Sequence, residues 1–138
     1  MKYLLDTNVL LWVITGNEER VSSEIYDILN DSANDIYYSM ASVWEVGIKY
    51  IKNPKLMEFS PENFVKLCDK LGFIRLSINC DHIYTLKDIK LAEGAPDHKD
   101  PFDRLIMSQA KYENMIMITG DLTLRWYNLK NMIFINEG

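Results

Sequence analysis

The first twelve residues, MKYLLDTNVLLW, place a carboxylate directly after a short apolar run. The run Tyr3–Leu5 is typical of a buried strand of a parallel sheet, and Val9–Trp12 is typical of the first turns of a helix. Asp6 therefore stands at the carboxyl end of a strand, which is the edge of an open α/β sheet where ligands bind. A carboxylate buried there needs a cation or hydrogen bonds to compensate its charge. The simpler interpretation is that Asp6 only caps the helix, while Thr7 and Asn8 bond amides of the turn.

Strand-like and helix-like segments alternate along the rest of the chain. Further strands are predicted over 36–38, 73–78, 115–119 and 132–135. Helices are predicted over 22–30, 40–51, 60–71, 81–88 and 100–113, with a polar connection over 90–99 and a helical turn over 122–127. This alternation predicts a single α/β domain, 1–138, with a central, mainly parallel sheet of four to five strands.

Composition excludes some classes of function. The 138 residues carry a net charge of -5, which argues against a sequence-independent nucleic-acid coat, because such a protein would be basic. Two cysteines, Cys68 and Cys80, give no disulfide framework, and both lie in apolar contexts typical of core thiols. No stretch approaches the length of about 18 apolar residues that a membrane span needs, and no signal-peptide cleavage pattern is present. The sequence therefore predicts a cytoplasmic protein without membrane contact.

Four acidic residues share one topological position. Asp6 follows the first strand, Glu45 lies in the helix after the second strand, Asp103 lies in the first turn of a later helix, and Asp121 follows the strand 115–119. At one edge of a parallel sheet these carboxylates repel each other, and raised pKa values or bound divalent cations relieve the repulsion. Oxygen ligands without a Cys/His cluster favour Mg²⁺ or Mn²⁺ over zinc. Such a metal polarises a phosphoryl oxygen and activates a water for attack on phosphorus.

Each of these acids also has a purely structural interpretation. Glu45 can pair with Lys49 on the next turn of its helix, and Asp103 stands where an acid stabilises the helix dipole. Asp121 can cap the turn that follows it. Taken together, these alternatives do not explain why all four acids fall at one edge.

Four blocks, MKYLLDTNVLLW, SMASVWEVGIKY, HKDPFDRLIMSQA and MITGD, cover nearly the whole chain. With these blocks the sequence resembles the PIN domain family, and in particular the VapC-type toxin ribonucleases of type II toxin–antitoxin pairs. The resemblance implies a three-layer α/β/α sandwich and an endoribonuclease dependent on Mg²⁺ or Mn²⁺, which hydrolyses RNA to 5′-phosphate and 3′-hydroxyl ends. It also implies a homodimer and a small antitoxin as partner. The acidic composition favours a structured RNA substrate, such as tRNA or rRNA, bound at a few points.

The resemblance assigns roles to single residues. Asp6, Glu45 and Asp103 match the three acids at the heart of the family's site, and Asp121 matches a fourth, more variable acid. The supporting residues are Thr7, Asn8, Asp100, Arg104 and Thr119. Of these, the two threonines match hydroxyl residues that support the first and last acids, and Asp100 is either a helix cap or an outer ligand. Arg104 reaches a substrate phosphate or an acid, or is only a solvated charge.

Other residues are expected to contribute less. His82 and His98 are not expected to be catalytic, because a metal-activated water needs no histidine base. Trp12 and Trp44 lie on apolar helix faces and are expected to pack in the core or at an interface rather than stack on bases, whereas base stacking stays open for Trp126.

The apolar segment Leu56, Met57 and Phe59 is either an antitoxin docking surface or a local core cluster.

Two rival functions also follow from the sequence. A catalytically silent PIN-like module that binds RNA or protein is the main alternative. A phosphatase with Asp6 as nucleophile is disfavoured, because Asp6-Thr7-Asn8 lacks a second acid two residues on.

Overall fold

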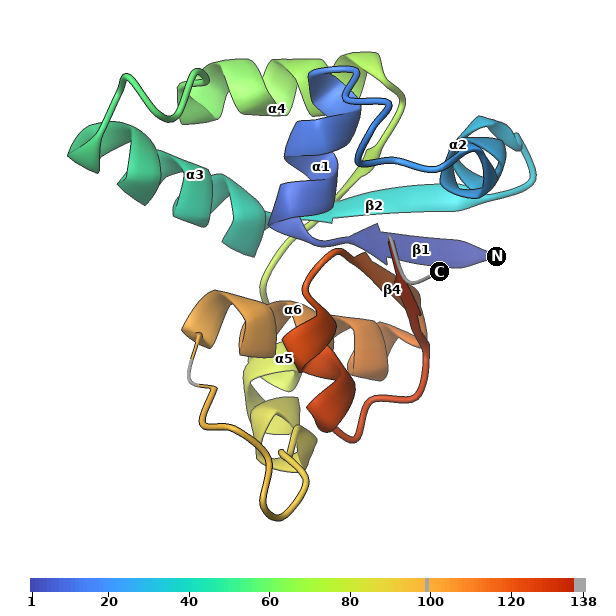
Figure 1. Ribbon diagram of the computed structural model, residues 1–138, viewed down its shortest axis with the longest axis vertical. Helices are drawn as coiled ribbons and strands as arrows, with labels where there is room; N and C mark the ends of the chain where they lie inside the picture. The colour runs from blue at the N-terminus through green and yellow to red at the C-terminus, as the bar shows by residue number, and fades with distance from the viewer. Residues whose placement is uncertain (99, 136–138) are drawn as a thin grey trace.

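A five-stranded parallel sheet forms the centre of the computed structural model, which describes residues 1–98 and 100–135 (Figure 1). Its strand order is β3-β2-β1-β4-β5, and every neighbouring pair is parallel. The strands are β1 (Lys2–Leu5), β2 (Asp35–Ser39), β3 (Ile74–Leu76), β4 (Ile116–Thr119) and β5 (Met132–Phe134). The predicted sheet is confirmed. Lys99, at the end of the predicted polar connection, and the last three residues of the predicted domain lie outside the described residues.

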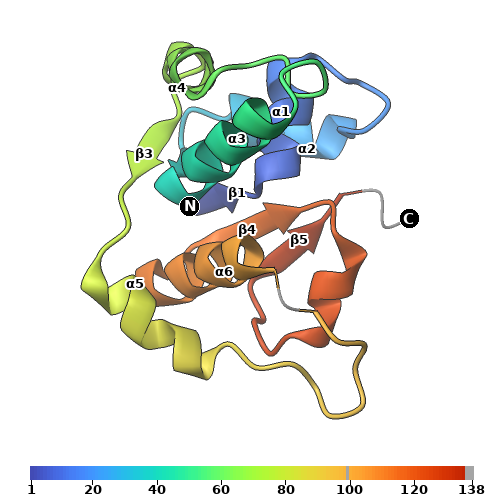
Figure 2. The same cartoon turned by 90° about the vertical axis from the view of Figure 1, so that its left-hand side faces the viewer.

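Helices cover both faces of this sheet, so the predicted three-layer α/β/α sandwich is confirmed (Figure 2). One layer contains α1 (Thr7–Ile14), α2 (Ser23–Asn30), α3 (Met40–Lys52) and α4 (Pro61–Lys70). The other contains α5 (Cys80–Thr85), α6 (Pro101–Glu113) and the short 3₁₀ helices η1 (Leu86–Asp88) and η2 (Leu122–Trp126). In the described part of the chain, no helix has both the length and the apolar character to cross a bilayer.

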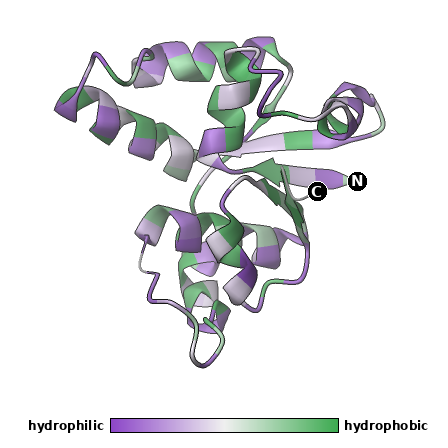
Figure 3. Cartoon of the chain, viewed as in Figure 1, coloured by the Kyte–Doolittle hydropathy of each residue, from purple (hydrophilic) through white to green (hydrophobic). Residues whose placement is uncertain are grey.

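The strands supply two separate cores because successive side chains point to opposite faces. Leu5 of β1 packs with Ile118 of β4 on the α1 side, whereas Leu4 and Met117 pack on the α6 side. All four side chains are fully buried. The hydrophobic colouring of β4 and of the end of β1 reflects this two-sided burial (Figure 3).

The chain direction places a switch point beside β1. From β1 the chain continues outward through β2 to β3, then returns through α5 and α6 to add β4 and β5 on the other side of β1. The carboxyl ends of β1 and β4 are therefore neighbours at the point where the strand order reverses, and ligands bind at such points in open α/β sheets.

Three local predictions need correction. The helix expected over 81–88 divides into α5 and η1. The strand expected over 73–78 shortens to the three residues of β3, an edge strand whose Ile74 is exposed. Cys80 is exposed, unlike the buried Cys68, because it opens the short helix α5, in which only His82 is buried.

A close contact next to β4 gives a test of this packing. A Cβ added to Gly120 would lie 2.5 Å from two ring carbons of Trp12, a side chain packed against the α1-side core. We expect Gly120→Ala to lower the free energy of unfolding by about 1–3 kcal/mol in urea denaturation, because Trp12 must leave its place. In Gly47→Ala the new Cβ would lie 3.7 Å from Pro61, so helix propensity should leave stability unchanged or raise it. Equal losses in the two variants would contradict the proposed contact.

Candidate metal centre

Asp6 stands at the carboxyl end of β1, and hydrogen bonds hold both of its oxygens. Oδ1 accepts from the backbone N–H of Thr7 at 2.8 Å, and Oδ2 accepts from the Thr119 hydroxyl at the end of β4 at 2.7 Å. Asp6 is thus the N-cap of α1 and also a buried carboxylate. The capping interpretation and the site interpretation are therefore compatible.

The Thr7 side chain connects two helices at this edge. Its hydroxyl lies 2.8 Å from the hydroxyl of Ser42 in α3, so Thr7 supports Asp6 through its backbone amide and not through its side chain. Ser42 stands one turn before Glu45 on the same helix. The contact therefore fixes the part of α3 from which Glu45 projects. Sequence analysis did not single out Ser42, whose only signal is a small polar residue one turn before an acid.

Glu45 has one paired and one unpaired oxygen. Oε2 lies 2.9 Å from Nζ of Lys49, which confirms the expected pair on successive turns. Oε1 is buried, and no donor in the described part of the chain reaches it. Because the residue is only 8% exposed, this oxygen lacks the compensation that a buried charge needs. The unpaired oxygen fits a divalent cation bound at this edge.

Asp100 fixes the beginning of α6. Its Oδ1 accepts from the backbone N–H groups of Phe102 at 2.9 Å and Asp103 at 3.1 Å, and Pro101 occupies the first helical position. The predicted helix cap is confirmed, whereas the outer-ligand role of Asp100 stays a prediction. The cap presents Asp103, whose side chain is 14% exposed, toward the other acids.

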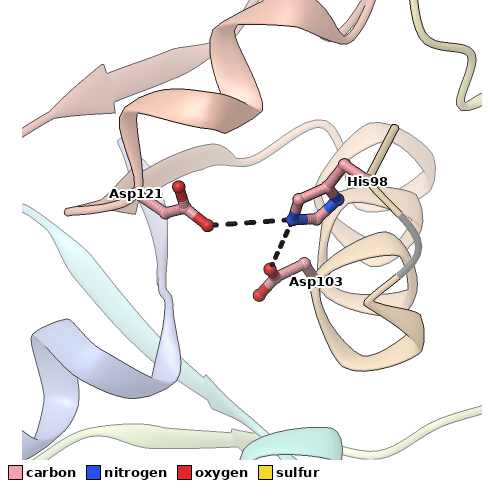
Figure 4. Close-up of side chains that lie close together, drawn as sticks. All are labelled: His98, Asp103 and Asp121. Carbon is pink, nitrogen blue, oxygen red and sulfur yellow. Dashed lines mark ion pairs between the residues drawn. The ribbon is translucent and has the colours of Figure 1, made fainter. Parts of the chain in front are cut away.

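Asp121 and His98 complete a cluster with Asp103 (Figure 4). Asp121 caps η2, because its Oδ1 accepts from the backbone and the hydroxyl of Thr123 at 3.0 and 2.6 Å. Its Oδ2 faces His98, whose Nε2 lies 3.8 Å from it and 3.3 Å from Oδ2 of Asp103. One potential ligand atom from each of the three residues lies within 4.8 Å of the others.

His98 is the site residue that sequence analysis undervalued. The expectation that only oxygen side chains gather at this edge is wrong, because its imidazole faces two of the predicted acids. The signal available in the sequence was its position just before the Asp100 cap. His82, in contrast, is fully buried and bonds Glu113 at 2.9 Å between α5 and α6.

Burial and mutual repulsion shift the acids toward their protonated forms. Burial raises the pKa of Asp6 to about 6 against the hydrogen bonds it accepts, and Glu45 and Asp121 contribute to the rise. The pKa of Asp103 rises to about 8. Burial is the largest cause of this rise, and the charges of Asp6 and Asp100 are the next largest. The acids predicted from the sequence thus influence one another electrostatically at one place.

Two further supporting residues behave differently from the acids. Arg104 is half-buried, and its Nη2 donates to the carbonyl oxygens of Leu86 at 3.3 Å and Ile89 at 3.2 Å. It therefore joins α6 to η1 and is not a solvated charge. Asn8 is exposed in the first turn of α1.

An aromatic pair bounds the acidic cluster. Trp44 is 59% exposed and therefore lies outside the core, and it meets Phe102 edge-on with ring centroids 5.0 Å apart. Trp44 directly precedes Glu45 and Phe102 directly precedes Asp103, so the pair joins α3 and α6 beside the acids. Trp12 packs against the core as expected, and Trp126 is exposed.

Comparisons with known proteins agree with this geometry. The family model of the PIN domain matches residues 3–127, so the chain belongs to the PIN domain family. A search of curated proteins returned no match.

Solved structures share the fold at low sequence identity. The crystal structure of VapBC2 from Rickettsia felis, bound to a DNA fragment from their promoter, matches with a TM-score of 0.71 and 17% identity, covering 99% of this chain and 100% of that chain. VapBC-1 from nontypeable Haemophilus influenzae matches with a TM-score of 0.59 and 16% identity over 91% and 90% of the two chains. A domain of a functionally unknown protein from Methanocaldococcus jannaschii matches with a TM-score of 0.59 and 17% identity, covering 99% of this chain and 92% of that chain.

The raised pKa values predict how stability depends on pH without metal. The native state holds protons that the unfolded chain has released, on Asp6 between about pH 4 and pH 6 and on Asp103 between about pH 4 and pH 8. The free energy of unfolding should therefore fall as pH rises, by at most about 1.4 kcal/mol per pH unit for each group. Asp103→Asn removes one contribution, so its melting temperature at pH 8 in chelator should exceed that of the wild type by about 3 °C or more.

The exposed Asp27 of α2 supplies the control for this experiment. Asp27→Asn should keep the wild-type pH profile of the melting temperature. Parallel profiles for wild type and Asp103→Asn would show that Asp103 does not carry the predicted proton.

Proposed function

We propose that this PIN domain is a VapC-type toxin, an endoribonuclease that depends on Mg²⁺ or Mn²⁺. The observation that carries the proposal is the convergence of Asp6, Glu45, Asp103 and Asp121 at the switch point of the sheet, with one buried oxygen of Glu45 unpaired. Carboxylates at such a site suit these two cations. The fold shared with VapBC2 and VapBC-1 supports the same assignment.

The residues of this site have separate roles in the proposed reaction. Asp6, Glu45, Asp103 and Asp121 hold the cation, directly or through water. The cation, when bound, stabilises charge on the phosphoryl oxygens and lowers the pKa of an attacking water. Thr119 fixes the orientation of the Asp6 carboxylate by its 2.7 Å hydrogen bond. The products are a 5′-phosphate and a 3′-hydroxyl, because the bond from phosphorus to the 3′-oxygen breaks.

The arrangement of the other acids depends on contacts just outside the cluster. Asp100 fixes the start of α6 and hence Asp103, while the Thr7–Ser42 contact fixes α3 beside Glu45. Precise placement of this kind is what reduces the cost of reaching the transition state.

The substrate of the proposed reaction is RNA. The exposed face of Trp44 lies beside Glu45 and offers a surface on which one base can stack. A chain with a net charge of -5 has little capacity for a long phosphate tract, so a structured RNA such as tRNA or rRNA, held at a few points, fits best.

The partner of the proposed toxin is a small antitoxin. Of the apolar segment considered for docking, Leu56 is 81% exposed, whereas Met57 is buried and Phe59 is half-buried in the core. The segment is thus partly surface and partly core. We assign docking to a separate apolar groove along α3. The groove is lined by Met40, Val43, Trp44, Gly47, Ile48, Ile51 and Pro61. A homodimer and a cytoplasmic location complete the proposal.

Cleavage of RNA tests the proposal directly. Purified protein should cut a total-RNA mixture into discrete fragments with Mg²⁺ or Mn²⁺ and not with chelator. Asp103→Asn should reduce the rate by at least about 100-fold, because it removes an anionic ligand of the cation that stabilises charge on the phosphoryl oxygens. Asp27→Asn serves as the matched control and should cut like the wild type. Fragments that survive in Asp103→Asn would contradict the assignment, and RNA binding without cleavage would favour the silent binding module.

The role of Trp44 makes a separate prediction. Trp44→Ala should raise KM for RNA by about 5-fold or more with little change in kcat, because base stacking on an aromatic ring contributes about 1–3 kcal/mol. Trp44→Phe retains an aromatic face and should recover most of the affinity. Equal KM values for wild type and Trp44→Ala would remove Trp44 from the substrate surface.

A further inference from the structure

The hydrogen bonds between His98 and Tyr127 determine which nitrogen of the imidazole carries a proton. The Tyr127 hydroxyl donates its single proton to the carbonyl oxygen of His98 at 2.9 Å, because a carbonyl oxygen only accepts. Nδ1 of His98 lies 3.0 Å from the same hydroxyl oxygen, so Nδ1 must be the donor in that contact. In the neutral ring, Nε2 then carries the lone pair.

This lone pair faces two carboxylates. Nε2 lies 3.3 Å from Oδ2 of Asp103 and 3.8 Å from Oδ2 of Asp121 (Figure 4). Three electron-pair donors around one point repel each other unless a proton or a metal cation lies among them, and a metal cation can contact all three at once. Neighbouring ligands of one octahedral ion lie about 3.0 Å apart when each bond is about 2.1 Å long. The contact of 3.3 Å with Asp103 is near this value, and the contact of 3.8 Å with Asp121 is longer.

A second observation, independent of this cluster, also indicates a cation. Oε1 of Glu45 is buried and unpaired within the described residues, and the Glu45 charge acts on both Asp6 and Asp103. Glu45 therefore has one unpaired buried oxygen and acts electrostatically on Asp103, one of the two carboxylates that Nε2 faces.

Tyr127 gives His98 the environment of a metal ligand. Metal-binding histidines usually donate their second ring N–H to a neighbouring group, which fixes both the tautomer and the ring orientation. Tyr127 accepts that N–H, and its ring meets the imidazole edge-on with centroids 5.6 Å apart.

We propose that Nε2 of His98 binds the divalent cation directly, together with Asp103 and Asp121, and that this nitrogen ligand makes the centre favour Mn²⁺ over Mg²⁺. A nitrogen ligand disfavours Mg²⁺, which takes oxygen ligands, and Mn²⁺ is a transition-metal ion that the accompanying carboxylates suit. The inference rests on the proposed function in one respect, namely that a divalent cation binds at the acidic cluster.

Pulsed electron paramagnetic resonance of bound Mn²⁺ tests the inference without an activity assay. A nitrogen nucleus coordinated to Mn²⁺ gives a characteristic ¹⁴N coupling. The full chain without a histidine tag contains only His82 and His98, so the imidazole signal has two candidate sources. We expect the coupling in the wild type and in Asp27→Asn, and its loss in His98→Gln. Because the His98 side chain is partly exposed, circular dichroism should show that His98→Gln stays folded.

Titration of the same variants with each metal gives the second readout. His98→Gln should lower the Mn²⁺ affinity by at least about 10-fold and the Mg²⁺ affinity by less, so the preference for Mn²⁺ should fall. Tyr127→Phe removes the acceptor for Nδ1–H and should lower the Mn²⁺ affinity in the same direction.

The outcomes separate this inference from the proposed function. Bound Mn²⁺ without a ¹⁴N coupling in the wild type, or a coupling that persists in His98→Gln, overturns the role of His98 and leaves the nuclease proposal intact. Absence of Mn²⁺ binding to the wild type overturns the role of His98 and the metal dependence of the proposed function together.

Discussion

Repulsion between carboxylates that share one sheet edge is the constraint on which the rest of this structure depends. The pairing of β1 with β4 makes the carboxyl ends of two strands neighbours, and burial then strengthens the repulsion between Asp6 and the acids around it. Thr119 and the backbone of Thr7 relieve Asp6, and Lys49 relieves one oxygen of Glu45. Asp103 receives less compensation and shows the larger rise in pKa. The two hydrophobic cores on either side of the sheet hold these carboxylates close together, although their mutual repulsion would drive them apart in water.

Helix capping and function use the same side chains here. Asp6, Asp100 and Asp121 each accept a backbone N–H at the start of a helix, and each does so with Oδ1. A carboxylate has a second oxygen, and in Asp6 and Asp121 that oxygen faces other groups of the site. A capping carboxylate therefore has a fixed orientation, since the hydrogen bond to its first oxygen fixes the direction in which the second oxygen points. This double use explains why the sequence alone leaves both interpretations open.

The sequence predicts those features that depend on local pattern. The order of strands and helices, the parallel sheet and the gathering of Asp6 with Asp121 follow from periodicity and from the edge at which parallel strands end. The place of His98 does not, because it lies in an irregular connection and reaches the site only through tertiary contacts with Tyr127. For Trp44 the sequence leaves the core and an interface open, because the residue lies among apolar neighbours. Much of α3 extends beyond the sheet, and the exposed Trp44 ring lies outside the core (Figure 1). The pattern of apolar residues along a helix does not show how far the neighbouring elements extend, and hence which of its side chains they cover.

The hydrogen bond from Thr119 to Asp6 joins residues that are 113 positions apart in the chain. The first strand, although made first, gains its second neighbour only when β4 has been made, because β1 lies between β2 and β4. A growing chain on the ribosome therefore has Asp6 without its hydroxyl donor, and without Asp121, until β4 and the residues after it have been made. The topology therefore delays assembly of the acidic cluster until β4 pairs with β1, so a copy that lacks β4 has only part of the cluster.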